Sequence, residues 1–274
     1  MTAPLASLLV VSCDAYADLW PPFFSLLERN WPDCPFQRLL LTNSAIYKRS
    51  DVRVLQTGPD EGWATNLSKA LPQVETPYVL MMLEDFLLNR RVVSPLLIRL
   101  LEELHELQGA YLRLRPFPPA DFPLARFPLL GEIEPGAPYR AALQAAFWKV
   151  ESLRELLIPG ETPWEMEHLG SRRSDMLNEG FYCVHRPALS YVAGVSLGKW
   201  TPWGIAACRE QGIPIDRVAR TALSKRETLR AIPGKIYNRL LNSIPWKIRR
   251  RIFFLIRSSG LRKGRELPSQ DRDR

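Results

Sequence analysis

The chain has few cysteines and histidines, and it has no long apolar run. Its 274 residues include four scattered cysteines, none in a Cys-X-X-Cys pair. This usage fits a reducing compartment and argues against a disulfide scaffold. No run reaches the roughly 18–20 apolar residues that a spanning helix needs. The amino terminus has no basic residues before its short apolar run, so it predicts a first strand and not a signal peptide.

Several catalytic motifs are missing as well. The sequence contains no Walker loop, Gly-X-Ser-X-Gly, His-Glu-X-X-His or Gly-X-Gly-X-X-Gly, which disfavours kinases, hydrolases and dehydrogenases. The three histidines do not have metal-ligand spacing. His105 is expected on a helix surface, whereas His168 and His185 are candidate third ligands for a metal held by other residues.

Positive charge is concentrated at the carboxyl end. From Arg217 onward there are 17 Lys and Arg against 4 acids, and the preceding residues carry a net charge of −5. Bulky apolar residues alternate with the basic ones over 244–257, as in a helix that lies on an anionic membrane surface. The alternative is a helix packed on the domain with a solvated basic face. Nucleic acid is not expected as a partner, because the apolar residues are clustered.

The first ninety residues alternate strand-like and helix-like segments, which predicts a mostly parallel sheet flanked by helices. We predict strands at 6–12, 37–41, 52–55 and 78–83, and helices at 20–30 and 65–71. Later segments predict a helix at 95–107 and strands at 111–114, 181–185 and 191–195. The proline-rich segment 116–138 is expected to be either a lid over the acceptor or an ordinary surface loop. The predicted parts are an α/β domain (1–216), a basic amphipathic helical tail (217–263) and a disordered end (264–274).

The stretch Thr76–Leu88 is the one on which the functional prediction depends. Six apolar residues form a strand buried on both faces, and the strand ends at Glu84 and Asp85. Carboxylates in this place lie where open α/β sheets bind ligands, and they suit a hard divalent cation. The alternative is a polar turn or a helix cap. Polar residues at the ends of the other strands are expected at the same edge of the sheet, namely Ser12, Cys13, Asp14, Thr42 and Asn43.

A second pair of acids follows a predicted helix start. Thr162 is a good helix cap and Pro163 a good first residue. Glu165 and Glu167 are two residues apart, so on a helix they point about 200° apart and only one of them can face a site. Acids in a first turn also offset the helix dipole, which is the structural alternative.

Five segments together resemble bacterial nucleotide-sugar glycosyltransferases of the GT-A type, closest to those encoded with surface-polysaccharide genes: VSCDAYADLWPPFFSLL, GWATNLSKAL, TPYVLMMLEDF, TPWEMEHLGS and GVSLGKW. The resemblance covers about residues 5–205. It implies a GT-A-like, Rossmann-like fold with a donor sugar nucleotide lying across the strand ends. Ser12, Cys13, Asp14 and Asn43 would then lie near the base and ribose, with Trp63 and Asn66 bordering the donor.

The resemblance also implies roles for charged residues. Glu84 and Asp85 stand where the family has an Asp-X-Asp metal motif, and this departure leaves dependence on a divalent metal (Mn or Mg) open. Lys199 would suit the diphosphate as a fixed cation. Glu165 or Glu167 would be the general base of an inverting reaction, with Glu165 preferred because it adjoins Trp164.

We therefore predict a cytoplasmic glycosyltransferase, held peripherally on the inner face of the cell membrane by its basic tail. It would transfer a sugar from a nucleotide diphosphate to a glycan or lipid-linked acceptor in synthesis of cell-envelope polysaccharide such as lipopolysaccharide. The alternative is a non-catalytic adaptor that uses the same fold to bind a sugar nucleotide at the membrane surface.

Overall fold

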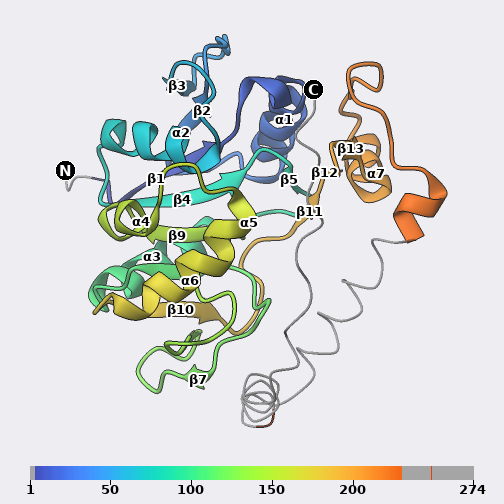
Figure 1. The fold of residues 1–274 in the computed structure, drawn as a ribbon. Helices are drawn as coiled ribbons and strands as arrows, with labels where there is room; N and C mark the ends of the chain where they lie inside the picture. Colours follow the sequence, from blue (N-terminus) through green and yellow to red (C-terminus); the bar gives the residue numbers. More distant parts are fainter. Residues whose placement is uncertain (1–3, 230–247, 249–274) are drawn as a thin grey trace.

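A nine-stranded mixed sheet organises the chain, which the computed structural model describes at residues 4–229 and 248. Its strand order is β3-β2-β1-β4-β9-β6-β10-β8-β7, from the top of the view to the bottom (Figure 1). The strands are β1 Ala6–Val11, β2 Gln37–Thr42, β3 Val52–Gln56, β4 Tyr78–Leu83, β6 Tyr111–Arg113, β7 Phe122–Pro123, β8 Leu130–Glu132, β9 Ala146–Lys149 and β10 Phe181–Val184.

Four neighbouring strands, β3-β2-β1-β4, are all parallel, as the sequence predicts. The second half of the sheet is mixed. β9 runs antiparallel to both β4 and β6, β10 is parallel to β6, and β8 is antiparallel to β10. Because β9 lies between β4 and β6, these two strands point the same way, and their carboxyl ends share an edge of the sheet with the amino end of β9.

Hydrophobic cores lie on both faces of the sheet, and alternate residues of β1 serve different cores. Leu8 and Val10 pack with α1 (Trp20–Asn30) and α3 (Ser94–Glu106). Leu9 and Val11 pack with α2 (Trp63–Ala70) and α4 (Val150–Leu156). Burial of each such leucine contributes about 2 kcal/mol. This two-sided burial explains why β1 and β4 are continuous apolar runs, and it confirms the expected helix–sheet–helix layers.

The other helical segments are mostly short. A 3₁₀ segment at Asp14–Leu19 leads into α1, and another at Leu71–Gln73 ends α2. A continuous helical run comprises α5 (Pro163–Glu165), a π-helical turn (Met166–Gly170), α6 (Ser171–Arg173) and a 3₁₀ turn (Ser174–Met176). The last described helix of the domain is α7 (Pro202–Glu210). The helix predicted at 65–71 begins two residues earlier, at Trp63, directly after Gly62 with its positive φ of 92°.

The strand predicted at 191–195 is present as two short strands, β11 (Tyr191–Ala193) and β12 (Val195–Ser196), which Gly194 separates. Their partners, β5 (Phe86–Leu88) for β11 and β13 (Lys199–Trp200) for β12, were not predicted from the sequence. The proline-rich segment contains β7 and β8, which extend the sheet, so it is more than a loop. The Arg113 guanidinium donates to the carbonyls of Pro118 (2.8 Å) and Tyr139 (2.9 Å), so it joins the two ends of this segment.

The first described residues of the predicted tail contact the α/β domain. Trp200 N–H donates to Thr221 O at 2.8 Å, and Leu223 N–H donates to Trp200 O at 2.9 Å. The rest of the predicted tail and the predicted disordered end, apart from residue 248, lie outside the described residues. Within the described ranges, no helix is both long and apolar enough to cross a bilayer.

Candidate ligand site at the carboxyl edge of the sheet

The order of the parallel strands creates a topological switch point between β1 and β4. From β1 the chain passes to β2 and then β3, and it returns to β4 on the opposite side of β1. The register pairs Val11 with Leu83, which brings Ser12 and Cys13 beside Glu84 and Asp85. Open α/β sheets bind ligands outside the carboxyl ends of the strands at such a point.

Glu84 and Asp85 occupy the turn between β4 and β5, and both side chains are half-buried. Burial in protein surroundings raises the pKa of Glu84 to about 8, and the neighbouring charge of Asp85 raises it further. Burial also raises the pKa of Asp85, to about 7, against the opposing effect of the Val195 N–H. The two carboxyl groups thus hold protons close to neutral pH, as expected for acids that a bound cation would help to ionise.

Residues from three strand ends share this electrostatic environment. Burial raises the pKa of the Cys13 thiol, and the charges of Glu84 and Asp60 add to the effect. The pKa of Tyr16 is raised by burial and then by Glu84. The loops after β1, β3 and β4 therefore converge. The Ser12 hydroxyl already has a partner at this edge, because its Oγ accepts a hydrogen bond from Trp20 Nε1 at 2.8 Å.

Asp14 and Asn43 join the loops that follow β1 and β2. The Asp14 carboxylate accepts hydrogen bonds from the N–H groups of Asn43, Ser44 and Ala45, each at 2.9 Å. Asp14 N–H in turn donates to Asn43 Oδ1 at 3.0 Å. The Asn43 side chain is buried, and its Nδ2 has no hydrogen-bond partner in the described part of the chain. A buried amide without a partner is costly and is available to a ligand acceptor.

Trp63 and Asn66 lie in the adjacent β3–α2 connection. Asn66 Nδ2 donates to Asp60 Oδ1 at 2.7 Å, and Asn66 Oδ1 accepts from Glu61 N–H at 3.2 Å. Asn66 thus shapes the loop that brings Asp60 toward Cys13. Trp63 is half-buried against the second hydrophobic core, and its Nε1 is buried without a partner among the described residues.

Lys199 has a partner of its own in this structure. Its Nζ lies 2.7 Å from Glu227 Oε1, in the segment predicted as tail. The hydrogen bond with Lys199 is the main cause that lowers the pKa of Glu227. The hairpin that carries Lys199 is tied to the acidic turn, since Gly194 N–H donates to Asp85 O at 2.6 Å and Thr201 N–H donates to Gly194 O at 2.8 Å. A diphosphate at Lys199 would have to compete with Glu227.

Arg220 is a neighbour of the site that sequence reasoning missed. Its Nε and one terminal nitrogen donate to the two oxygens of Asp18, each at 2.8 Å, and the guanidinium lies 4.4 Å from the centre of the Tyr16 ring. The positive charge of Arg220 also lowers the pKa of Glu84. No sequence pattern predicts this contact, because Arg220 follows Asp18 by 202 residues and lies in a segment interpreted as tail.

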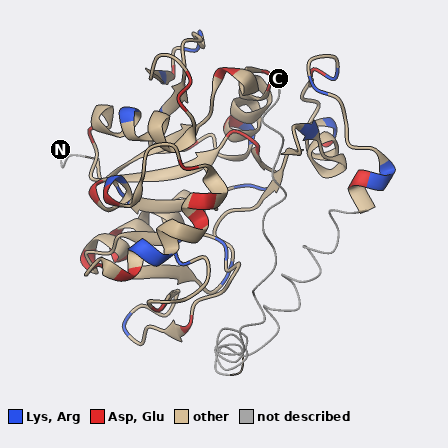
Figure 2. Cartoon of the chain, viewed as in Figure 1, with Lys and Arg blue, Asp and Glu red and all other residues tan. Residues whose placement is uncertain are grey.

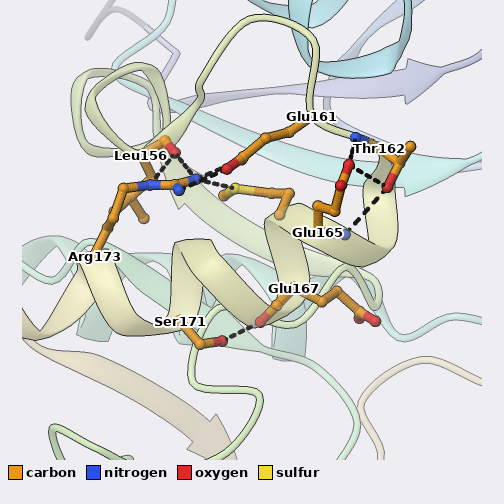
Figure 3. A network of polar contacts seen from close by, with 8 residues as sticks. Leu156, Glu161, Thr162, Glu165, Glu167, Ser171 and Arg173 are labelled. Carbon is orange, nitrogen blue, oxygen red and sulfur yellow. Dashed lines mark hydrogen bonds and ion pairs between the residues drawn. The ribbon is translucent and has the colours of Figure 1, made fainter. Parts of the chain in front are cut away.

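The two predicted general bases have different surroundings (Figure 3). The Glu165 carboxylate accepts from Thr162 N–H (2.8 Å) and Thr162 Oγ1 (2.9 Å), while Glu165 N–H donates to Thr162 Oγ1, which forms a capping box. These hydrogen bonds lower the pKa of the exposed Glu165. Thr162 is thus the helix cap, as predicted. In Figure 2 this acidic helix start is followed by basic residues in α6.

Glu167 is directed toward the sheet. Its Oε1 accepts from Leu143 N–H at 2.8 Å, and burial raises its pKa. Leu143 lies three residues before β9, whose amino end shares an edge of the sheet with the carboxyl end of β4. Glu167 therefore lies toward the same edge as the acidic turn, whereas Glu165 forms part of the cap at the amino end of the helix.

No group of three or more His, Cys, Asp or Glu side chains arranged to hold a metal is present among residues 4–229. His168 contacts Tyr139, with 5.1 Å between ring centres. The carboxylates of Glu84 and Asp85 are the hard oxygen donors that Mg²⁺ or Mn²⁺ takes. Such ions commonly bind through one or two carboxylates together with substrate phosphates. The acidic turn fits that pattern, and metal dependence stays a prediction.

No protein-family model matches the chain, and neither does any curated protein. Solved structures of S. aureus TarS 1–349 match with 13% identity over 65% of this chain and 58–60% of that chain, at TM-scores of 0.43–0.44, and two of them contain UDP or UDP-GlcNAc. A Leptospira borgpetersenii cytidylyltransferase matches with 10% identity over 88% of this chain and 98% of that chain, at a TM-score of 0.46.

The matches thus span about 60% of the length of the TarS 1–349 chain and 36% of a longer TarS structure, and all of these scores are too low to assign an activity. The class of the fold is defined by the sheet itself. Four parallel strands in the order β3-β2-β1-β4, helices on both faces and a switch point with polar strand ends define a Rossmann-like mixed α/β domain.

Proposed function

We propose that the protein is a nucleotide-sugar glycosyltransferase whose donor lies across the carboxyl ends of β1, β2 and β4. The observation that carries the proposal is the meeting, at one switch point, of an acidic turn and a buried amide that has no partner among the described residues. This combination offers oxygen ligands for a phosphate-bound cation and a hydrogen-bond donor for a base or ribose. The sequence resemblance to GT-A enzymes supports the same assignment.

Each part of the edge then has a role. Asn43 Nδ2 would donate to the nucleoside, with Cys13 and Asp14 forming the adjacent wall. Glu84 and Asp85 would hold a divalent cation. When bound, the cation would neutralise charge on the leaving diphosphate. Lys199 would contact the donor diphosphate once its ion pair with Glu227 is broken.

Glu167 is the stronger candidate for the general base of an inverting reaction. Its pKa is raised, which brings it nearer to the working pH, and it lies toward the edge that carries Glu84. Glu165 already accepts two hydrogen bonds and has a lowered pKa, so it is the weaker proton acceptor. The base would accept a proton from the acceptor hydroxyl as the new glycosidic bond forms.

The acceptor and the location of the reaction belong to the same proposal. We propose a glycan or a lipid-linked sugar as acceptor, in cell-envelope polysaccharide synthesis. The proposed peripheral attachment to the inner face of the membrane rests on the basic and bulky apolar composition of 244–257.

A thermal-shift screen tests the donor assignment. The full-length protein is heated with UDP-, GDP-, CMP- and dTDP-sugars, each with Mn²⁺, Mg²⁺ or EDTA. A ligand that binds only the folded state adds roughly 2.7 kcal/mol at about 100 times its Kd. We expect one nucleotide to raise Tm in a metal-dependent way.

The matched variants are Asp85→Asn at the acidic turn and Glu75→Gln as the control, because Glu75 lies at the opposite end of β4 in an exposed pair with Arg53. Asp85→Asn should lose the shift and Glu75→Gln should keep it. A shift that survives both EDTA and Asp85→Asn would move phosphate binding away from the acidic turn. No shift with any donor would contradict the transferase proposal and favour an adaptor.

A further inference from the structure

An arginine stands at the same edge of the sheet as the acidic turn, two residues beyond the end of β6. Arg115 is half-buried, and its guanidinium lies 4.4 Å from the centre of the Tyr191 ring and 5.5 Å from that of Phe117. Tyr191 stacks in turn on Phe86, with 4.5 Å between ring centres and 21° between planes. Phe86 directly follows Asp85, so two packed side chains, Tyr191 and Phe86, connect the arginine to the acidic turn.

Tyr191 lies between the two charges. Burial raises the pKa of its hydroxyl, the positive charge of Arg115 lowers it, and the negative charge of Asp85 raises it. The hydroxyl also accepts a hydrogen bond from Ala145 N–H at 3.3 Å, just before β9. Arg115 and Asp85 therefore both act on one phenol ring that is fixed to the sheet.

The hydrogen-bonding capacity of Arg115 is largely unused. A guanidinium has five N–H donors. Arg115 makes one long hydrogen bond, to Tyr191 O at 3.3 Å, and a side-chain hydrogen bond with the Tyr191 hydroxyl that lowers the pKa of that group. Its Nε is buried without a hydrogen-bond partner, and no carboxylate in the described ranges forms an ion pair with it. The Nε of nearby Arg113 is likewise buried without a partner among the described residues, but the two terminal nitrogens of Arg113 donate to the carbonyls that close the proline-rich segment.

An arginine that lies over an aromatic ring, with unused N–H donors and no carboxylate partner among the described residues, is suited to bind an oxyanion. A half-buried cation without a carboxylate partner is also unfavourable by itself, and an anion would offset this cost. We propose that Arg115 binds a phosphate group of a substrate. Arg115 follows β6, so this site would lie on the other side of the acidic turn from Cys13 and Asp14, which border the proposed nucleoside site. The proposal rests on the proposed function only in its choice of source, which is either the donor diphosphate or a phosphate on the acceptor.

The test uses inorganic pyrophosphate, added to the full-length protein in EDTA, with binding measured by calorimetry and thermal shift. Arg115→Gln should weaken pyrophosphate binding about tenfold or more, as expected for loss of a charge-assisted contact. Arg115→Lys, which keeps the charge, should retain part of the affinity. It replaces Arg115→Gln in the test if that variant does not fold. Arg126→Gln is the control, because Arg126 also stacks on an aromatic ring of the proline-rich segment but is exposed and paired with Glu106.

Combined ligands distinguish the two sources. Competition between pyrophosphate and the nucleoside diphosphate found in the donor screen would assign Arg115 to the donor. Additive thermal shifts would assign it to a phosphate on the acceptor. Unchanged pyrophosphate binding in Arg115→Gln, or no binding by the wild type up to about 10 mM, would overturn the proposal.

The two proposals can fail separately. A protein that binds sugar nucleotides equally well with and without Arg115, and no pyrophosphate, would keep the transferase and lose the arginine site. A protein that binds pyrophosphate through Arg115 but no sugar nucleotide would keep the anion site and lose the transferase.

Discussion

Two pairs of acids are candidates for roles at this site, and their surroundings differ. Glu84 and Asp85 are adjacent in a half-buried turn, and burial raises the pKa of both. In the helical run after Thr162, Glu165 is exposed and hydrogen-bonded and has a lowered pKa, whereas Glu167 is half-buried and has a raised one. The comparison shows that position in the fold, more than residue type, decides whether the pKa of a carboxyl group is raised or lowered.

Replacement of Asp85 should produce the greatest loss of activity. Asp85→Asn removes the negative charge from the switch-point turn and keeps the side-chain shape, so sugar transfer should fall by roughly 100- to 1,000-fold. Steady-state assays with the donor from the screen would measure it, with Glu75→Gln as the control. Full activity in Asp85→Asn would place the chemistry elsewhere.

The second pair should respond unequally. Glu167→Gln removes the proposed base and should lower kcat by about 100-fold or more, with little change in donor KM. Glu165→Gln should change kcat by less than about threefold, because this residue serves the helix cap. Parallel kinetics on the two variants check the difference, and the reverse order of effects would return the base role to Glu165.

The raised pKa of Glu84 predicts a pH-dependent cost in the ligand-free protein. Because the folded state holds a proton that the unfolded chain releases near pH 4.5, the stability contribution of Glu84 falls as pH rises from about 4.5 to 8. Glu84→Gln should therefore stabilise the ligand-free protein by about 1–2 kcal/mol at pH 8, and by almost nothing at pH 4. Urea denaturation at the two pH values measures this, and a gain that is equal at both would contradict the raised pKa.

The smallest effect is expected at the helix start. Thr162→Ala removes the cap hydrogen bond and should cost about 1 kcal/mol of stability, a fall in Tm of roughly 2–4 °C. Calorimetry checks the size, and Thr162→Ser, which keeps the hydroxyl, is the control. A loss of activity beyond the loss of folded protein would show that this end of the helix takes part in the reaction.

The first half of the fold could be predicted from the sequence because its signals are local. The runs at 6–11 and 78–83 are continuous and apolar since both of their faces are buried, and proline opens α1 near its amino end. The strands β5 and β13, which were not predicted, have three and two residues, too few to show a detectable period. β5 forms by pairing with β11, about a hundred residues later in the chain, and β13 by pairing with the adjacent β12.

The residues that gather at the candidate edge could be predicted from the sequence, but their contacts could not. The end of a buried strand marks Glu84 and Asp85, and the turn residues Asp14 and Asn43 follow from the same logic. The roles of Arg115 and Arg220 depend on contacts with Tyr191 and Asp18, which are far away in the sequence. The sequence preference for Glu165 over Glu167 rested on the neighbouring Trp164. The capping box and the contact with Leu143 are the grounds on which we propose Glu167 instead.

The most direct measurement is a crystal structure of the protein with the nucleoside diphosphate that gives the greatest thermal shift, together with Mn²⁺. We predict density for the nucleotide across the ends of β1 and β4, with the nucleoside within hydrogen-bond reach of Asn43 Nδ2 and the metal on Asp85. A nucleotide bound at another surface, with the acidic turn unchanged, would contradict the assignment of this edge as the donor site.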